Sequence, residues 1–323
     1  MTKKCILITG GLGFIGSNLV RKVLLNSDQR IIVLDKVSYS GKIENLPTDD
    51  SAQKRIKFIC GDVTNRKVVE DAVGQSSVII HLAANTNAFK SFSHPLSTIR
   101  SNFLGTCTLL EAVKKNEVDK FIYLSSSEVY GNHQKEIEMN ENHPLIPLSP
   151  YAVSKLASDR LAYSLYLTNN LPVVILRPFN VYGPFQHPEK MIPKFVTLLM
   201  RNKKITLNNG GFQTRDWIYV DDLTEAILKV VRTPIDKIRG EIFNVGTGKA
   251  ASVKQVADII LKNLGRDESL IRIAPGLQPG TIGNIGISSR AREKLNWVPK
   301  VNLEEGIQMT VDWYKENEKW WSR

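Results

Sequence analysis

The chain has 323 residues, of which 42% are hydrophobic and 23% are charged, and its formal net charge is +11. These values indicate a globular protein of about two domains, and no apolar run approaches the roughly 20 residues that a membrane span needs. The lysines are scattered and form no basic stripe with interleaved aromatic residues, so we expect neither a nucleic-acid nor a membrane partner.

The first residues lead directly into a short apolar run and show no signal-peptide pattern. Cys5, Cys60 and Cys107 are widely spaced among apolar residues. We therefore expect reduced thiols and a cytoplasmic protein.

Short apolar runs predict the strands of a buried parallel sheet. They span residues 5–9, 30–34, 56–60, 78–82, 120–124 and 173–176. Helical stretches at 17–25, 66–73, 99–115 and 154–167 separate most of them. This alternation predicts an α/β fold with a doubly wound parallel sheet, because βαβ crossovers are right-handed.

A glycine-rich turn lies between the first strand and the first helix. It contains Gly10, Gly13 and Gly16. Glycine lets backbone N–H groups approach a pyrophosphate at the start of a helix, so the turn predicts a dinucleotide site. Phe14 and Ile15 are expected to contact the same cofactor. A plain turn is the alternative.

Asp35 ends the second strand, 19 residues after Gly16. A carboxylate at this position accepts hydrogen bonds from a ribose and repels a 2′-phosphate, which favours NAD over NADP. Lys36 weakens that preference. Asp62 and Val63 follow the third strand and are expected to face the adenine, with a turn role as the alternative for Asp62.

A polar cluster follows the strand at 120–124, at the edge of the sheet where ligands bind. Ser126 and Ser127 offer hydroxyl groups to a sugar and to a tyrosine. Glu128 is expected to act as a general base if burial raises its pKa. Serine turns are common, and a surface glutamate is the alternative for Glu128.

Tyr151 and Lys155 stand four residues apart, so a helix places them on one face. Tyr151 is expected to take the proton of a substrate hydroxyl group. Lys155 is expected to stabilise the phenolate form of Tyr151, which accepts this proton, and to contact the nicotinamide ribose. Together with the glycine turn, the pair predicts hydride transfer at a carbon that bears a hydroxyl group. A chance pair on a solvated helix is the alternative.

Prolines and glycines become frequent after about residue 180, and helical stretches follow at 192–201, 223–231 and 253–264. We predict a dinucleotide-binding domain over residues 1–180. Residues 181–323 are predicted to form mainly a smaller substrate-binding lobe at the carboxyl edge of the sheet, with some segments returning to the sheet.

These motifs together resemble the extended short-chain dehydrogenase/reductases that act on nucleotide sugars. The matching stretches are residues 9–16, 81–84, 125–131, 151–155 and 177–184. Within that group, residues 35–46, 183–193 and 214–220 are most similar to the nucleotide-sugar 4,6-dehydratases.

The resemblance implies further ligand contacts. Leu82, Ala83, Ala84 and Pro178 would also contact NAD. Asn180 and Arg215 would hold the diphosphate of the sugar nucleotide, and Lys190 would line the same region. A salt bridge with the adjacent Asp216 is the alternative for Arg215. The resemblance implies no metal.

The sequence departs from the dTDP-glucose dehydratases at three places. Those enzymes usually carry Thr-Asp-Glu where this chain has Ser126-Ser127-Glu128, and their aspartate protonates the leaving 6-hydroxyl. Here either Glu128 carries out both proton transfers or a water relays one. GDP-mannose dehydratases and sugar-acid decarboxylases have a similar Ser-Glu pair.

The other two departures concern substrate contacts. Residues 274–280 lack the arginines with which relatives bind the diphosphate. Residues 85–89 differ from the glucose-specific enzymes as well, which leaves an N-acetylhexosamine as a possible substrate.

We therefore predict an NAD-dependent dehydratase that acts on a UDP- or dTDP-hexose, with UDP-N-acetylglucosamine included. A transient ketone at C4 would acidify the C5 proton and allow water to leave across C5 and C6. The product would be a 4-keto-6-deoxy sugar or a 5,6-ene sugar. The alternatives are a 4-epimerase, a UDP-glucuronate decarboxylase and a non-catalytic NAD-binding protein.

The resemblance also implies a homodimer. The helices predicted at 99–115 and 151–167 would pair with those of a second subunit as a four-helix bundle. Alternatively, their apolar faces only cover the sheet.

Overall fold

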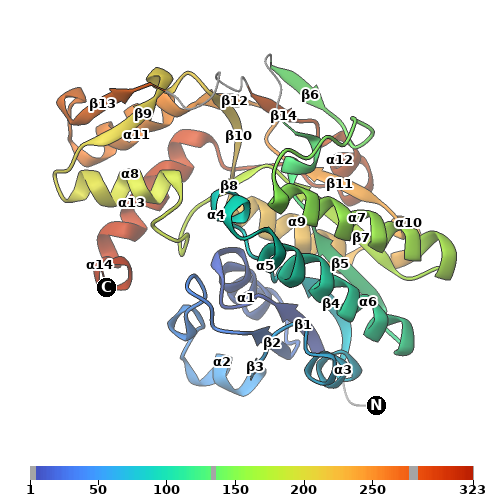
Figure 1. Ribbon diagram of the computed structural model, residues 1–323. Helices are drawn as coiled ribbons and strands as arrows, with labels where there is room; N and C mark the ends of the chain where they lie inside the picture. Colours follow the sequence, from blue (N-terminus) through green and yellow to red (C-terminus); the bar gives the residue numbers. More distant parts are fainter. Residues whose placement is uncertain (1–4, 132–135, 276–282, 323) are drawn as a thin grey trace.

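The computed structural model describes residues 5–131, 136–275 and 283–322. Its centre is a seven-stranded sheet in the order β11-β7-β5-β4-β1-β2-β3 (Figure 1). Every pairing in this sheet is parallel. The strands are β1 (Cys5–Thr9), β2 (Ile31–Asp35), β3 (Ile56–Cys60), β4 (Ser76–His81), β5 (Lys120–Leu124), β7 (Val173–Pro178) and β11 (Ile242–Val245). The predicted doubly wound α/β fold is confirmed.

Helices cover both faces of the sheet, which explains why its strands are apolar along their whole length. One face packs against α1 (Phe14–Asn26), α9 (Val220–Arg232) and α12 (Ser289–Leu295). The other face packs against α3 (Arg66–Gly74), α6 (Gly105–Lys115) and α7 (Pro150–Asn169). Alternate residues of each strand therefore enter different cores, as with Ile6 and Leu7 in β1.

The helix predicted at 99–115 has three parts. It begins with α5 (Pro95–Ile99), continues through the π-helical segment η2 (Arg100–Leu104) and ends as α6. The wider turn at η2 contains Asn102, which is almost fully buried and donates a hydrogen bond from Nδ2 to Ser154 Oγ at 2.9 Å. Such a bulge is frequent beside functional sites.

A smaller lobe lies beyond the carboxyl ends of the strands, and three small sheets contribute to this side of the fold (Figure 1). Its core lies between α8, α11 and α13. Trp320 and Trp321, in the C-terminal helix α14, pack against this core. The elements of this region are β8 (Asn180–Tyr182), α8 (Met191–Met200), β9 (Ile205–Asn208), β10 (Thr214–Tyr219), β12 (Ala250–Ser252), α11 (Val253–Leu264), β13 (Ile271–Ala274), α13 (Leu303–Glu316) and α14 (Glu318–Trp321).

Part of residues 181–323 belongs to the main sheet instead of the lobe. β11 forms the edge of that sheet, and α12 packs on it. The helix predicted at 223–231 is α9, and its Leu223 and Ile227 pack in the core of the main sheet. This differs from the expected place in the lobe, because an amphipathic pattern shows that a face is buried without showing against what.

The remaining elements are short. They are η1 (Ile43–Asn45), α2 (Asp50–Arg55), α4 (Ala88–Ser93), η3 (Ser127–Tyr130), β6 (Ile137–Met139), η4 (Asn209–Gly211), α10 (Ile235–Ile238), η5 (Glu268–Leu270) and β14 (Asn284–Gly286). β6 and β14 pair in parallel beside the main sheet.

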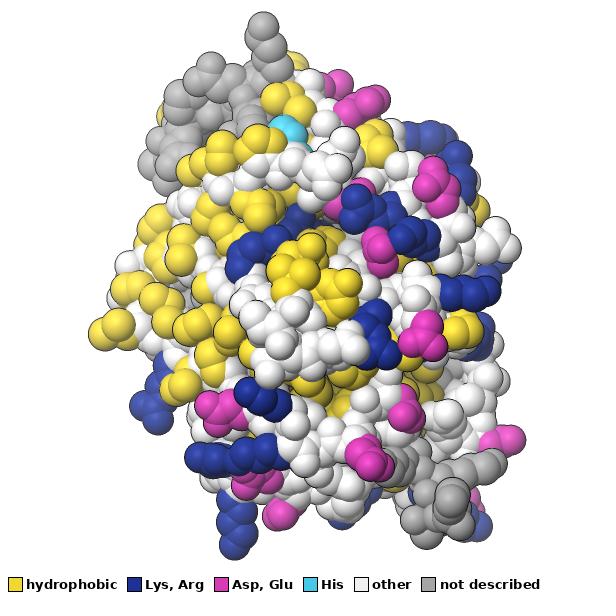
Figure 2. All heavy atoms as spheres, turned by 90° about the vertical axis from the view of Figure 1, so that its right-hand side faces the viewer, with side chains coloured by type: hydrophobic (Ala, Val, Ile, Leu, Met, Phe, Trp, Pro, Cys, Tyr) yellow, Lys and Arg dark blue, Asp and Glu magenta, His cyan; other side chains and the backbone are white. Residues whose placement is uncertain are grey.

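Lys and Arg side chains are spread over the face shown in Figure 2, among acidic and apolar ones, and do not gather in one stripe. None of the helices in the described part of the chain combines the length and the apolar character that crossing a bilayer requires.

Candidate active site

A cavity of about 570 Å³ opens at the carboxyl ends of the strands of the main sheet. Except for Arg215, every residue predicted for the site lines it. These residues are Gly10, Gly13, Phe14, Ile15, Gly16, Asp35, Lys36, Asp62, Val63, Leu82, Ala83, Ala84, Ser126, Ser127, Glu128, Tyr151, Lys155, Pro178, Asn180 and Lys190. The fold thus brings segments that are up to 180 residues apart in sequence, from Gly10 to Lys190, to one place.

The glycine turn is too tightly packed for side chains. A Cβ atom on Gly16 would lie 2.2 Å from the carbonyl oxygen of Gly10, and one on Gly10 would lie 2.7 Å from the backbone nitrogen of Ala83. Gly10 also has a φ of +72°, which favours glycine. The turn then leads into α1, with Gly13 as its N-cap. This geometry fits the pyrophosphate of a dinucleotide, because the backbone itself forms the wall.

The Asp35 carboxylate is held in place by the backbone. It accepts hydrogen bonds from Leu12 N at 3.1 Å and from Val37 N at 3.0 Å. Burial raises the pKa of Asp35, while these bonds oppose the shift. Lys36 Nζ lies 3.2 Å from Asp62 Oδ2, so these two neighbours form an ion pair beside the cavity.

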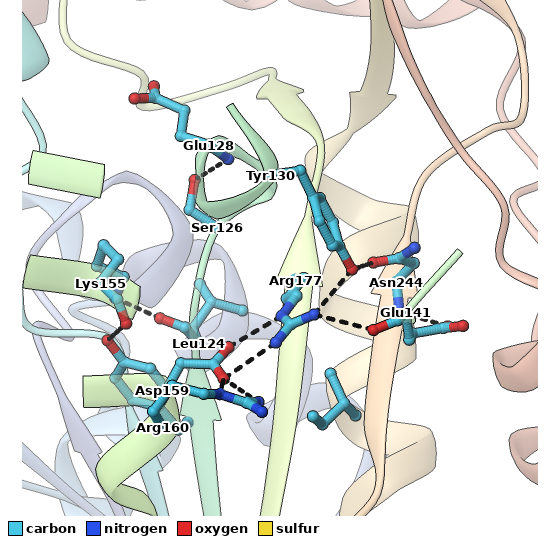
Figure 3. A network of polar contacts seen from close by, with 12 residues as sticks. Leu124, Ser126, Glu128, Tyr130, Glu141, Lys155, Asp159, Arg160, Arg177 and Asn244 are labelled. Atoms are coloured by element: carbon cyan, nitrogen blue, oxygen red, sulfur yellow. Dashed lines mark hydrogen bonds and ion pairs between the residues drawn. The ribbon is translucent and has the colours of Figure 1, made fainter. Parts of the chain in front are cut away.

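The serine cluster forms the turn η3 directly after β5. Ser126 Oγ caps the turn by accepting a hydrogen bond from Glu128 N at 3.2 Å, as Figure 3 shows. The side chains of Ser126 and Ser127 are nearly buried, whereas Glu128 is exposed to the cavity. The hydroxyl of Ser125 is buried, and no hydrogen-bond partner is found for it in the described structure.

Tyr151 and Lys155 lie in the first two turns of α7. Ser149 caps this helix by accepting a hydrogen bond from Ala152 N at 3.1 Å, and Pro150 occupies the first turn. Both side chains are less than a tenth exposed. Lys155 Nζ donates to the carbonyl oxygen of Leu124 at the end of β5. The helix therefore presents both groups to the same cavity.

Burial changes the proton affinity of both groups. It raises the pKa of Tyr151, and the nearby Glu128 charge raises it further, while a hydrogen bond with Ser126 opposes the shift. Burial lowers the pKa of Lys155 to about 7, against the opposing charge of Asp159. A lysine poised near neutral pH is a feature that active sites share.

Glu128 has two cations near it. Protein walls surround its carboxyl group although the side chain faces the cavity, and this desolvation raises the pKa of Glu128. The charges of Lys190 and Arg215 oppose the shift. A carboxyl group with a raised pKa in a cavity suits general acid–base chemistry near neutral pH.

The three predicted substrate residues come from two neighbouring strands and a loop. Asn180 begins β8, and Trp217 of β10 is its strand partner. Arg215 lies two residues earlier in β10. Burial lowers the pKa of Arg215, although the Glu128 charge opposes this shift. Lys190 donates from Nζ to the carbonyl oxygen of Thr86 at 3.0 Å.

The alternative considered for Arg215, a salt bridge with Asp216, has little support. Asp216 accepts hydrogen bonds from Thr247, Gly248 and Gly286. Neighbouring residues of a strand point to opposite faces, which separates the two side chains.

Sequence reasoning missed a group of polar side chains at the mouth of the cavity. Tyr39 donates from its hydroxyl to Glu189 Oε1 at 2.7 Å, and Asn87 donates from Nδ2 to Glu189 Oε2 at 3.2 Å. Lys90 lies 4.7 Å above the Tyr39 ring. The three segments that carry these residues are far apart in sequence, so no local signal joins them.

Part of one prediction lies outside the described residues. The stretch that lacks the expected arginines falls largely on residues 276–282. In the described ranges, no three His, Cys, Asp or Glu side chains are grouped as metal ligands.

The arrangement suits oxidation and reduction of a hydroxyl-bearing substrate. The tight glycine turn, a fixed carboxylate at the end of β2 and an open cavity between them fit a dinucleotide. A buried tyrosine and a buried lysine line the same cavity as a carboxyl group that is open to it. The site therefore combines a place for a redox cofactor with two groups that can move protons.

Comparison with known proteins agrees with this geometry. The family model described as "NAD dependent epimerase/dehydratase family" matches residues 6–246. The dTDP-glucose 4,6-dehydratase of Streptomyces niveus is 36% identical over 98% of this chain and 94% of its own length.

Two solved structures are also similar. The dTDP-glucose 4,6-dehydratase DesIV of Streptomyces venezuelae, solved with NAD and TYD bound, has a TM-score of 0.92 at 33% identity and covers 98% of both chains. A UDP-glucose 4-epimerase of Thermotoga maritima, solved with UDP-glucose, has a TM-score of 0.89 at 30% identity, over 97% of this chain and 99% of its own. The resemblance predicted from the motifs is thus confirmed, and the chain belongs to the NAD dependent epimerase/dehydratase family.

Proposed function

We propose that this protein is an NAD-dependent nucleotide-sugar dehydratase, which removes water across C5 and C6 of a nucleoside-diphosphate hexose. The observation that carries the proposal is the single cavity that Tyr151, Lys155 and Glu128 line together with the glycine turn and Asp35. A tyrosine and a lysine alone serve oxidation at C4. The added carboxyl group supplies the base that abstraction of the C5 proton requires.

When bound, NAD would supply reversible acceptance of a hydride from C4 of the sugar. Gly10, Gly16 and Asp35 would hold the cofactor. Tyr151 takes the proton of the C4 hydroxyl in its phenolate form, which Lys155 stabilises by its charge. The C4 ketone then acidifies the C5 proton.

Glu128 takes the C5 proton, and hydroxide is lost from C6 with a proton supplied by an acid. Ser127 stands where relatives carry an aspartate, and a serine hydroxyl is a weak acid. Glu128 itself is then the group that returns a proton, because desolvation raises its pKa. Return of the hydride to C6, with a proton from solvent added at C5, would give a 4-keto-6-deoxy sugar, and return of the hydride to C4 would give a 5,6-ene sugar.

NAD is proposed in preference to NADP. The Asp35 carboxylate is oriented by two backbone N–H groups and faces the cavity. Lys36, which would attract a 2′-phosphate, is paired with Asp62 instead. The Asp35 carboxylate would therefore repel the 2′-phosphate of NADP, and Lys36 would offset little of this repulsion.

The proposal is tested by incubating the protein with a panel of UDP-, dTDP- and GDP-sugars, including UDP-N-acetylglucosamine, followed by mass spectrometry. Loss of one water from one substrate supports it. An unchanged mass with an inverted C4 centre indicates a 4-epimerase, and loss of carbon dioxide indicates a decarboxylase.

Tyr151→Phe separates an enzyme from a non-catalytic NAD-binding protein. The variant removes only the hydroxyl group, and we expect turnover to fall by about 10²- to 10⁴-fold while NAD still binds. Turnover at the rate of the unchanged protein would refute the role of Tyr151.

We also propose a homodimer. Helices α4, α5 and α7 pack together, and they carry several apolar side chains that are exposed in the single chain. Phe89, Phe92, Leu96 and Val153 are between 45% and 82% exposed. Burial of such a patch by a second copy would stabilise the dimer.

Leu96→Glu tests this interface by placing a charge in the apolar patch. The variant is expected to be a monomer in light-scattering measurements, and a dimer that persists would contradict this interface.

A further inference from the structure

A positively charged side chain lies in the core directly behind the proposed active site. Arg177 of β7 is 1% exposed. Its Nε donates to Asp159 Oδ2 at 2.9 Å, and its Nη2 donates to Asp159 Oδ1 at 3.1 Å. Nη1 donates to the hydroxyl oxygen of Tyr130 at 3.0 Å and to the carbonyl oxygen of Glu141 at 3.3 Å. Figure 3 shows the guanidinium at the centre of this network.

The network continues away from Arg177 and closes on itself. The Tyr130 hydroxyl donates to Asn244 Oδ1 of β11 at 2.7 Å. The backbone nitrogen of Asn244 donates to Glu141 Oε1 at 2.9 Å. The guanidinium and its partners are therefore joined to two strands, one helix and two loop segments, with little freedom to move.

Stability alone is a weak reason for such an arrangement. A buried ion pair often contributes no more than a well-packed apolar pair of the same volume, because both charges lose their hydration. Although burial alone would raise it, the hydrogen bonds and charges of Arg177 and Arg160 hold the pKa of Asp159 below its usual range. The pair thus stays charged and keeps a defined, two-pronged geometry.

Two of the partners lie close in sequence to the proposed catalytic groups. Tyr130 ends the turn η3, two residues after Glu128. Asp159 lies one helical turn beyond Lys155 in α7, and its charge also raises the pKa of Lys155. One guanidinium therefore touches both the element that carries the carboxyl group and the element that carries the tyrosine and lysine.

We propose that Arg177 is a positioning residue for the reaction. By holding Tyr130 and Asp159 on one guanidinium, it determines where the turn η3 lies relative to helix α7. The inference rests on the proposed function, because the turn carries Glu128 and the helix carries Tyr151. Proton abstraction at C5 requires these two groups to address neighbouring carbons of one sugar ring, so a small shift of the turn misplaces the base.

The test uses Tyr130→Phe, which removes the hydroxyl group that joins Arg177 to Asn244 and keeps the ring. The assay follows solvent deuterium entering C5 of the 4-keto-6-deoxy product, a reaction that needs the base alone. We expect this exchange to slow by about 10- to 100-fold, since a misplacement of about 1 Å can cost a factor of about 10². Tyr166→Phe is the matched control, because Tyr166 lies on the same helix α7 and its ring packs beside Gly240, away from Arg177.

A second readout separates positioning from general destabilisation. With substrate deuterated at C4, the isotope effect on turnover should move toward one in Tyr130→Phe, because the C5 step becomes slower than the C4 step. Arg177→Lys keeps the positive charge but loses the planar guanidinium that donates two hydrogen bonds to Asp159. It should show the same selective slowing of C5 exchange. If it does not fold, Tyr130→Phe still decides the question.

The outcomes are distinct. C5 exchange at the rate of the unchanged protein in Tyr130→Phe overturns the inference, as does an equal slowing of both steps. If the unchanged protein removes water from none of the nucleotide sugars tested, the proposed function fails instead. Loss of water without C5 exchange indicates the 5,6-ene product, and the C4 isotope effect then decides the inference.

Discussion

At the residue scale, the site depends on ionisable groups whose proton affinity differs from that of the free side chain. Lys155 and Glu128 are shifted in opposite directions by the same cause, desolvation, since burial favours the neutral form of each. The sequence predicted that Glu128 would need such a shift to act as a base. The direction of the shift agrees with that condition, while the role itself is a proposal.

Glu128→Gln tests that role. Without a base, exchange of the C5 proton with solvent is expected to fall by about 10²- to 10⁴-fold, while NAD binding is retained. Deuterium incorporation followed by mass spectrometry measures the first, and a titration measures the second. Glu138→Gln, at an exposed position of β6, serves as the control. Undiminished exchange in Glu128→Gln would show that another group is the base.

Lys155 predicts a pH dependence of stability. The folded protein loses the lysine proton near pH 7, whereas the unfolded chain keeps it to about pH 10.4. Between these values the unfolded state binds more protons, so the free energy of unfolding contributed by Lys155 rises with pH, by up to about 1.4 kcal/mol per unit.

Denaturant unfolding of the unchanged protein and of Lys155→Met at pH 7 and pH 9 measures this effect. The difference in stability between the two should change in favour of the unchanged protein as the pH rises. Lys194→Met, at an exposed position of α8, should show no such change. A difference that stays constant between the two pH values would be inconsistent with a depressed pKa.

At the element scale, the carboxyl ends of β1, β2, β3, β4, β5 and β7 bring the site together. Each strand end delivers one short segment to the cavity, because parallel strands finish at the same edge. The glycine turn after β1 is the tightest of these segments, since the β4 end packs directly on it. The motif was visible in the sequence, but the close approach to Ala83 was not.

Gly16→Ala is expected to weaken NAD binding by more than about 100-fold. The added Cβ would lie 2.2 Å from the carbonyl oxygen of Gly10, so the turn must open and its N–H groups lose their alignment. Isothermal titration with NAD measures the affinity. Gly74→Ala is the matched control, because its Cβ would meet no atom nearer than 3.6 Å. Equal affinities for the two variants would argue against the turn as the cofactor site.

At the scale of the whole molecule, the C-terminal residues contact the cofactor half of the chain. Trp320 donates from Nε1 to Asn45 Oδ1 at 2.7 Å, and Lys42 lies 4.4 Å above its ring. Asn45 in turn donates from Nδ2 to the carbonyl oxygen of Leu12 in the glycine turn at 2.8 Å. The tail thus supports the loop that follows β2.

The same tail holds a second loop. Phe185 has a φ of +64°, an unusual conformation for a bulky residue. Its ring centroid lies 4.7 Å from that of Trp313 and 6.0 Å from that of Trp320, and Arg21 lies 4.2 Å from it. The residues that follow Phe185 reach the cavity, so the packing of the tail bears on the shape of the site.

Trp320→Ala is therefore expected to lower stability by about 2 kcal/mol, through the lost ring contacts and hydrogen bond, and to weaken NAD binding about tenfold. Thermal unfolding and an NAD titration measure the two effects. Phe212→Ala removes an aromatic ring that is 78% exposed and should change neither. A loss of stability with unchanged NAD affinity would limit the tail to a packing role.

The sequence by itself determined the class of fold and about half of the residues that line the cavity. Apolar runs and helical periods are local, and the glycine turn and the pair Tyr151 and Lys155 have a short fixed spacing. Such patterns can be recognised before folding because neighbouring residues impose them. The strand β11 was missed, since a four-residue run at a sheet edge carries too weak a signal.

Only the tertiary structure decided which distant residues meet. The contact of Arg177 with Tyr130 and Asp159, the ion pair of Lys36 with Asp62, and the contact of the tail with Asn45 each join separate segments of the chain. The direction of the pKa shifts was decided in the same way, because desolvation depends on what surrounds a group in space. These features follow from packing and from strand order, which no local pattern of residues encodes.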